Sequence, residues 1–181
     1  MKITIVGPRS VGKSTASKIL AANLNLEYIS SDNIMNKAMK KYGGLDKVIK
    51  SGETYRIIEV AVSQLEDVMK KDDFVYDLAG GAISSTKNKE VVDNIKAIVK
   101  ANTIVVGLLP YKNKNRSLEF LFNREKEREH FKNENHDKLH QEVEDSYNRL
   151  EKIIPRFCTH VIYVESKSPQ EIANEIKKKI K

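Results

Sequence analysis

The sequence has a single cysteine, no tryptophan and no long hydrophobic run. Because Cys158 is the only cysteine among 181 residues, an internal disulfide is excluded and a reducing compartment such as the cytoplasm fits. No apolar run approaches the ~20 residues that a transmembrane helix needs. Residues 1–7 reach a glycine-containing turn too early for a secretory signal peptide. We therefore expect a cytoplasmic protein without a membrane segment.

The charge is strongly basic, with a formal net charge of +7 and a pI of about 9.3. Such a surface could bind nucleic acid, or it could attract a polyanionic nucleotide and an acidic substrate. The lysines are scattered among glutamates, without interleaved aromatic side chains, which disfavours nucleic-acid binding. The basic end, residues 176–181, is typical of a solvated helix terminus rather than a membrane-binding segment. Small anionic ligands are the favoured partners, bound by a monomer or a small homo-oligomer.

Short apolar runs alternate with longer amphipathic ones, which is typical of a parallel sheet wrapped by helices. Predicted strands are Lys2–Val6, Glu27–Ile29, Phe74–Asp77, Thr103–Gly107 and Val161–Val164. Predicted helices are Lys13–Asn23, Asp32–Tyr42, Thr54–Lys70, Lys89–Lys100, an interrupted Leu118–Glu144, and Pro169–Ile180, the last one capped by Ser168. No repeat or linker appears, so residues 1–181 are predicted to form one three-layer α/β domain.

The segment of about residues 112–145 is highly charged and has few apolar residues to bury. Two interpretations remain open. It could be a solvated helix with i,i+4 ion pairs, or a mobile lid over the nucleotide.

The phosphate-binding loop is the strongest motif. Residues 7–14 fit G-x-x-x-x-G-K-[ST], follow a predicted strand and open a predicted helix, which is the context that this motif requires. Backbone N–H groups of such a loop point at phosphate oxygens, and the helix dipole adds positive potential. We expect Lys13 to reach the β- and γ-phosphates and the Ser14 hydroxyl to bind Mg²⁺. The predicted nucleotide-binding residues here are Gly7, Pro8, Arg9, Ser10, Val11, Gly12, Lys13, Ser14 and Thr15.

Acceptor-side candidates follow the second and third strands. Asp32 lies at the carboxyl edge of the sheet, where it could take a proton from an acceptor hydroxyl, or it could cap the next helix. Arg56 could present its guanidinium fork to a carboxylate or a phosphate, or form a surface pair with Glu59. Gly80 and Gly81 would let backbone approach a ligand without side-chain obstruction.

Taken in order, these motifs resemble shikimate kinase and related small-molecule P-loop kinases. The likeness covers Met1 to about Gly107 and returns over Thr159–Ile180. It implies the sheet order 2-3-1-4-5, ATP as phosphate donor, and an acceptor hydroxyl bound and activated by Asp32. It also implies that Arg56 holds the acceptor carboxylate and that Gly80 and Gly81 line the acceptor pocket. A second substrate arginine falls near Arg149 or Arg156, and either Arg124 or Arg128 matches the arginine of the lid.

The chain also departs from this pattern. The family has two aspartates where this chain reads Ser30-Ser31-Asp32, and its R-P-L-L lid signature is missing. Asp77 ends an apolar strand in a Walker B arrangement, so we expect it to bind Mg²⁺ with Ser14 in place of the missing aspartate. The alternative is that Asp77 only caps the following turn.

The predicted activity is transfer of the γ-phosphate of ATP to a hydroxyl of a small acidic substrate, with Lys13, Asp32 and Arg124 as catalytic residues. A nucleoside monophosphate kinase or a gluconate-type kinase on the same fold is the alternative. Asp32 favours a hydroxyl acceptor, because a carboxylate repels an incoming phosphate. A slow nucleotide-dependent switch is disfavoured, because a switch has no use for Asp32 and Arg56.

Overall fold

The computed structural model describes residues 1–44, 47–48, 51, 55–127 and 135–181. Its centre is a parallel five-stranded sheet in the order β2-β3-β1-β4-β5. The strands are β1 (Lys2–Val6), β2 (Glu27–Ser30), β3 (Phe74–Asp77), β4 (Ile104–Leu109) and β5 (His160–Tyr163). The predicted sheet order and α/β fold are therefore confirmed, with small differences at the strand ends.

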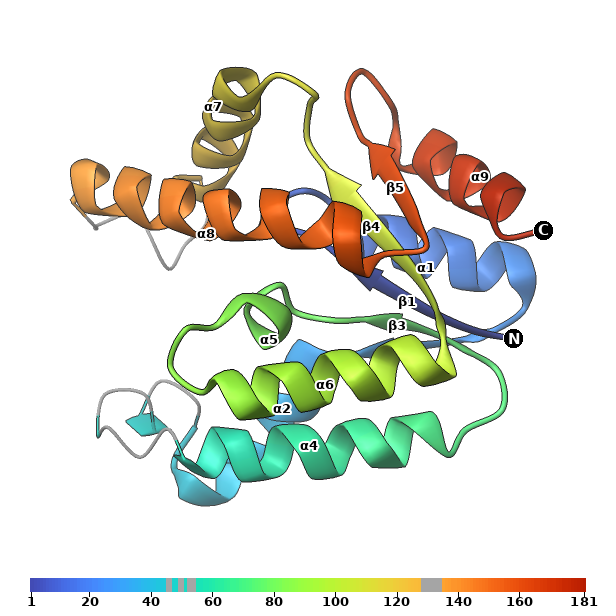
Figure 1. Cartoon of the computed structure of the whole chain (residues 1–181), viewed down its shortest axis with the longest axis vertical. Coiled ribbons are helices and arrows are strands. Elements are labelled where there is room, and N and C mark those ends of the chain that lie inside the picture. Colours follow the sequence, from blue (N-terminus) through green and yellow to red (C-terminus); the bar gives the residue numbers. More distant parts are fainter. Residues whose placement is uncertain (45–46, 49–50, 52–54, 128–134) are drawn as a thin grey trace.

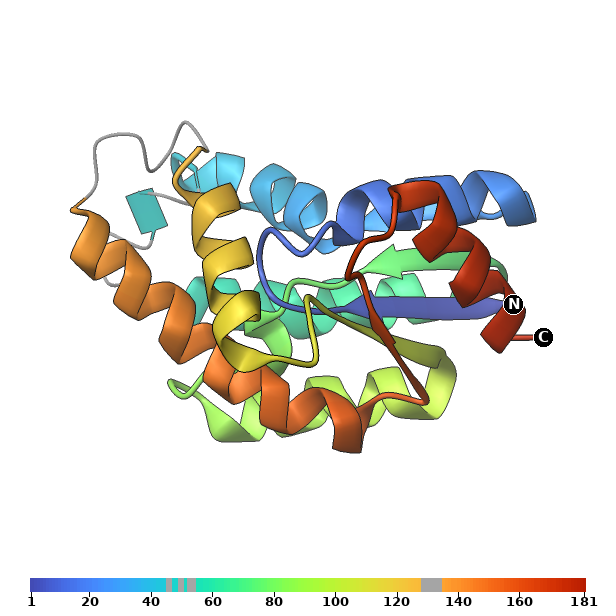
Figure 2. The same cartoon turned by 90° about the horizontal axis from the view of Figure 1, so that it is seen from above.

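The central strands are mostly apolar and almost completely buried because helices cover both faces of the sheet. Ile3, Ile5 and Val106 are completely buried, as is Phe74 at the start of β3. Figure 2 shows α1 (Lys13–Leu24) and α9 (Pro169–Lys179) on one side of the sheet and α6 (Lys89–Asn102) and α8 (His136–Phe157) on the other. This three-layer arrangement holds the carboxyl ends of the strands at one edge.

The remaining helices connect or flank these layers. They are α2 (Ser31–Met39), the 3-10 helix η1 (Lys40–Tyr42), α4 (Tyr55–Met69), α5 (Gly81–Ser84) and α7 (Lys114–Glu125), most of which are labelled in Figure 1. The predicted cap of α9 is present as a complete capping box between Ser168 and Glu171. Among the helices of the described residues, none is long and apolar enough to cross a bilayer.

The segment after residue 112 differs from its sequence-based prediction. It contains two helices, α7 and α8, and α8 continues through Pro155 to Phe157. The charged sequence hides apolar positions at helical spacing, and the buried ones are Leu118, Leu121, Leu139, Tyr147, Leu150, Ile154 and Phe157. Of these, only Leu118, Leu121 and Leu139 lie within residues 112–145, so few apolar side chains of the described part of that segment are buried, and its role as a lid stays a prediction.

The carboxyl-terminal end of α8 packs closely against β4 at Gly107. A Cβ atom at Gly107 would lie 2.4 Å from Ile154 Cγ2 and 2.9 Å from Cys158 Sγ, so only glycine fits without a shift of these neighbours. Burial raises the pKa of the Cys158 thiol to about 12, which leaves almost no thiolate at neutral pH.

Candidate active site

The candidate site lies where β1, β2 and β3 end. Asp77 is in register with Ile5 of β1 and with Ser30 of β2, so the residues that follow these strands share one edge of the sheet. In open parallel sheets this carboxyl edge is the usual place for ligand binding. The phosphate loop, Asp77 and Asp32 are thereby brought together.

The phosphate loop connects β1 to α1 in the shape its motif predicts. A Cβ atom at Gly7 would come within 2.6 Å of the Leu108 carbonyl oxygen, and Gly12 has a left-handed φ of 102°. The Lys13 ammonium donates hydrogen bonds to the carbonyl oxygens of Gly7 and Pro8, at 3.1 Å each. The lysine therefore folds back over its own loop, with its charge beside the loop's backbone.

Ser14 and Asp77 are in direct contact. The Ser14 hydroxyl donates to Asp77 Oδ2 at 2.5 Å, and the Tyr28 hydroxyl donates to the same oxygen at 3.2 Å. Burial and then the charge of Asp77 raise the pKa of Tyr28 above its usual value, so the phenol remains a donor at neutral pH. The predicted partners for Mg²⁺ thus form one hydrogen-bonded group, with Tyr28 as an additional member.

Glu125 is a site residue that the sequence analysis did not find. It ends α7, it is 1% exposed, and it accepts hydrogen bonds from the side chains of two loop residues. The Arg9 guanidinium donates at 3.3 Å, and the Ser10 hydroxyl donates to the other carboxylate oxygen. Glu125 lies in a highly charged stretch that is typical of a solvated helix, and its contacts with the phosphate loop depend on how α7 packs, which the sequence does not give.

A cleft of about 530 Å³ joins the phosphate loop to the acceptor-side candidates. It is lined by residues that include Pro8, Arg9, Lys13, Asp32, Gly80, Gly81, Glu125 and Arg149. Gly80 packs against the phosphate loop so closely that a Cβ atom there would lie 2.6 Å from the Gly7 carbonyl oxygen. Ser31 Oγ accepts a hydrogen bond from the Ala79 N–H at 2.9 Å, which ties this glycine turn to the end of β2.

Asp32 is exposed in the first turn of α2, inside this cleft. Ser30, not Asp32, caps the helix, because its side chain accepts from the Asn33 N–H at 3.3 Å. Burial, followed by the charges of Asp32 and then Asp77, raises the pKa of the Tyr76 phenol. The capping alternative for Asp32 is therefore wrong, because Ser30 occupies the cap position, and Asp32 lines the cleft.

The predicted arginines are placed differently from one another. Arg149 lines the cleft, whereas Arg156, about two turns further along α8, is not among the described residues that line it. Arg56 belongs to α4, but its side chain lies outside the described part of the structure. Arg128 also lies outside the described residues. Of the two predicted candidates for the second substrate arginine, Arg149 is thus the one that lines the cleft.

A second pocket of about 310 Å³ lies on the other side of the phosphate loop. It is lined by residues that include Val11, Gly12, Thr15, Tyr111, Phe120, Arg124, Lys167 and Pro169. The Arg124 guanidinium lies 5.1 Å from the centre of the Phe120 ring, which edge-packs on Tyr111. Arg124 therefore adds a positive charge to a mostly apolar wall.

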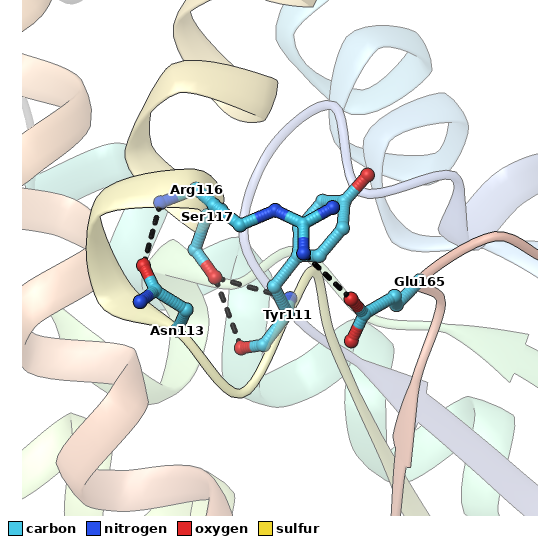
Figure 3. Close-up of polar contacts among 5 residues, drawn as sticks. All are labelled: Tyr111, Asn113, Arg116, Ser117 and Glu165. Carbon is cyan, nitrogen blue, oxygen red and sulfur yellow. Dashed lines mark hydrogen bonds and ion pairs between the residues drawn. The ribbon is translucent and has the colours of Figure 1, made fainter.

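The rim of this second pocket is fixed by the contacts drawn in Figure 3. Arg116 lies over the Tyr111 ring, 4.6 Å from its centre, and pairs with Glu165 at 3.2 Å. Ser117 Oγ is within 3.0 Å of both the N and the O atom of Tyr111. The first turn of α7 is thereby joined to the segment that follows β5, which carries Lys167 and Pro169.

The sequence model of the family described as "Shikimate kinase" matches residues 9–181. The chain belongs to the shikimate kinase family. A shikimate kinase of Vibrio parahaemolyticus is 24% identical over 176 residues, covering 97% of this chain and 94% of that protein. The prediction of the family is therefore confirmed, and the chain is an ATP-dependent phosphotransferase.

Two further comparisons describe the range of relatives within this fold. A shikimate kinase of Acinetobacter baumannii, solved in complex with shikimate, superposes with a TM-score of 0.79 at 19% identity, covering 99% of this chain and 92% of that one. A cytidylate kinase of Sulfurisphaera tokodaii is 49% identical over 43 residues, which is 24% of each chain. The long match is to a shikimate kinase, and the match to the nucleotide kinase is local.

Proposed function

We propose that this chain transfers the γ-phosphate of ATP to a hydroxyl of a small acidic acceptor, with shikimate as the first candidate. The observation that supports this most directly is the cleft that joins the phosphate loop to Asp32 and Arg149. Because the cleft is continuous, a phosphate donor on the loop and a hydroxylated acid beside Asp32 could bind next to each other. Holding the two substrates together accounts for much of the catalysis that such an enzyme needs.

On the acceptor side, Asp32 takes the proton of the attacking hydroxyl or holds that hydroxyl in line with the γ-phosphate. Arg149 presents its guanidinium to the acceptor carboxylate, and Arg56 is proposed to do the same from α4. Gly81, where a Cβ atom would meet nothing within 4 Å, leaves room for the acceptor, and Gly80 lets this turn lie close to the phosphate loop. The positions of these residues support the proposed roles, because Asp32, Arg149 and the glycine turn line the same cleft as Lys13.

On the donor side, residues 7–15 hold the phosphates through backbone N–H groups and the Lys13 ammonium. Arg124 holds the nucleotide from the second pocket, and Arg128 is its proposed companion. Residues of about 112–145 act as the lid. The position of Arg124 and Glu125 at the end of α7, next to the phosphate loop, supports this assignment.

Ser14 and Asp77 are the proposed holders of Mg²⁺. A buried carboxylate in contact with the loop hydroxyl is a set of hard oxygen atoms, which suits this ion. When bound, Mg²⁺ neutralises charge on the β- and γ-phosphates during transfer. In the described ranges no cluster of three His, Cys, Asp or Glu side chains offers a metal site, so the phosphates and water complete the coordination.

The proposal is tested by a phosphoryl-transfer screen with purified protein, ATP and Mg²⁺ against shikimate, gluconate and nucleoside monophosphates. Turnover of shikimate well above that of the other acceptors is expected. The local likeness to a cytidylate kinase makes a nucleoside monophosphate the second candidate. Preferential phosphorylation of a nucleoside monophosphate would overturn the acidic-hydroxyl assignment and leave the donor half intact.

A further inference from the structure

Tyr28 contacts the proposed metal site although no motif includes it. It lies on β2, two positions before Ser30, and Ser30 is in register with Asp77 of β3. Side chains two residues apart on a strand point to the same face of a sheet. Tyr28 therefore reaches along that face to Asp77, where its hydroxyl is 3.2 Å from Oδ2.

Asp77 is a buried carboxylate, only 4% exposed, so its orientation depends on its hydrogen-bond donors. Both of its described hydrogen bonds fall on Oδ2, one from Ser14 and one from Tyr28. Two donors on a single oxygen fix the plane of the carboxylate. In the described part of the chain no hydrogen bond to Oδ1 is found, so this oxygen keeps its capacity to accept another ligand.

The contact also determines what Ser14 presents. A hydroxyl that donates its proton to a carboxylate has its lone pairs directed away from it. The Ser14 hydroxyl donates to Asp77 at 2.5 Å, so a carboxylate held in place keeps those lone pairs in one direction. The Tyr28 ring itself is held by Lys18 of α1, whose ammonium lies 5.5 Å from the ring centre.

We propose that Tyr28 is a positioning residue for the metal of the phosphate donor. Its hydroxyl holds Asp77, and through Asp77 the Ser14 hydroxyl, in the orientation that binds Mg²⁺. The inference rests on the proposed function, which assigns Ser14 and Asp77 to the metal. It adds a residue from β2, a strand otherwise assigned to the acceptor side.

The test is Tyr28→Phe, which removes one oxygen atom and keeps the ring beside Lys18. Calorimetry measures binding of a non-hydrolysable ATP analogue with Mg²⁺ and, separately, in EDTA. With Mg²⁺ the dissociation constant should rise about tenfold or more, the effect of one lost hydrogen bond to a charged group. In EDTA it should not change. Mn²⁺ titration followed by electron paramagnetic resonance should show the same weakening of the ternary complex.

The matched control is Tyr163→Phe, which makes the same chemical change on β5 at the far edge of the sheet. It should leave all of these constants at the parent values. Equal weakening by Tyr28→Phe with and without metal would make Tyr28 a support of the loop and overturn the inference.

Asp77→Asn separates the inference from the proposed function. If this variant raises the Mg²⁺ requirement and Tyr28→Phe does not, the inference fails and the metal assignment stands. If neither variant alters metal dependence, the assignment of Asp77 to the metal fails, and the inference falls with it. A raised Mg²⁺ requirement in both variants supports both the assignment of Asp77 to the metal and the positioning role of Tyr28.

Discussion

The two halves of the cleft are built differently. On the donor side, Lys13 is bonded to its loop, Ser14 to Asp77, and Glu125 to two loop side chains, so the groups hold one another. On the acceptor side, Asp32 and Arg149 are exposed residues on two separate helices, α2 and α8. The residues proposed to transfer the phosphate are therefore held by hydrogen bonds to one another. The residues proposed to select the acceptor lie on two different helices, so each can be substituted without altering the other.

The sharpest test of the donor half is Lys13→Ala. Transfer should fall about a thousandfold or more, because the ammonium is expected to stabilise the charge that develops on the phosphates. A coupled assay measures the rate, and the melting temperature should equal that of the parent. Lys100→Ala, an exposed lysine on α6, serves as control. Turnover close to the parent in Lys13→Ala would remove the loop from the mechanism.

For the acceptor half, Asp32→Asn should lower kcat by about a hundredfold to ten-thousandfold, the usual range for loss of a general base. ATP affinity should be unchanged, since the loop is not altered. Because Ser30 caps α2, Asp32→Asn should keep the parent melting temperature, whereas Ser30→Ala should lose about 1 kcal/mol of stability. If Asp32→Asn lowers stability and spares kcat, the aspartate belongs to the helix and not to the reaction.

Substitution of two arginines on α8, one that lines the cleft and one that does not, tests whether the effect on the acceptor depends on position in the cleft. Arg149→Ala should raise the KM for the acceptor about tenfold to hundredfold, as expected for loss of a charged hydrogen bond. Arg156→Ala should change it less than about twofold, because Arg156 does not line the cleft in the described structure. The KM for ATP should stay constant in both. A larger increase in the acceptor KM for Arg156→Ala than for Arg149→Ala would show that the acceptor binds beside Arg156.

The smallest effect is expected for Glu125→Gln. The amide oxygen still accepts from Ser10, but the negative charge beside the loop is gone. ATP should therefore bind about threefold to tenfold more tightly, as measured by calorimetry. Weaker ATP binding by the variant would mean that the Glu125 carboxylate orders the phosphate loop and that its charge favours nucleotide binding.

Local features of the fold were predictable from the sequence. The phosphate loop needs two glycines, a lysine and a serine at fixed spacing, and the strand before it needs only an apolar run. The same holds for the cap of α9, where Ser168 and Pro169 act on their own backbone. Such signals depend on residues close in the chain, so no tertiary information is needed to read them.

The features that were not predictable depend on packing. Arg149 could not be preferred to Arg156 before Leu150 and Ile154 were known to face the body of the protein. Glu125 and Tyr28 were missed because each acts through a residue far away in the sequence, Ser10 or Asp77. The part of α8 after Glu144 was missed because its apolar positions are separated by charged and polar residues. At Pro155 the helix continues, since burial of Ile154 and Phe157 outweighs the lost hydrogen bond.

The close packing at Gly107 has a consequence for how this enzyme can acquire new acceptors. Ile154, which touches Gly107, and Arg149 lie on the same continuous helix, about 7.5 Å apart along its axis. A methyl group at position 107 would force the side chains of Ile154 and Cys158 to shift, and any part of that shift taken up by the backbone of α8 would reach Arg149. We therefore expect position 107 to influence the choice of acceptor through α8, without contact with the acceptor itself.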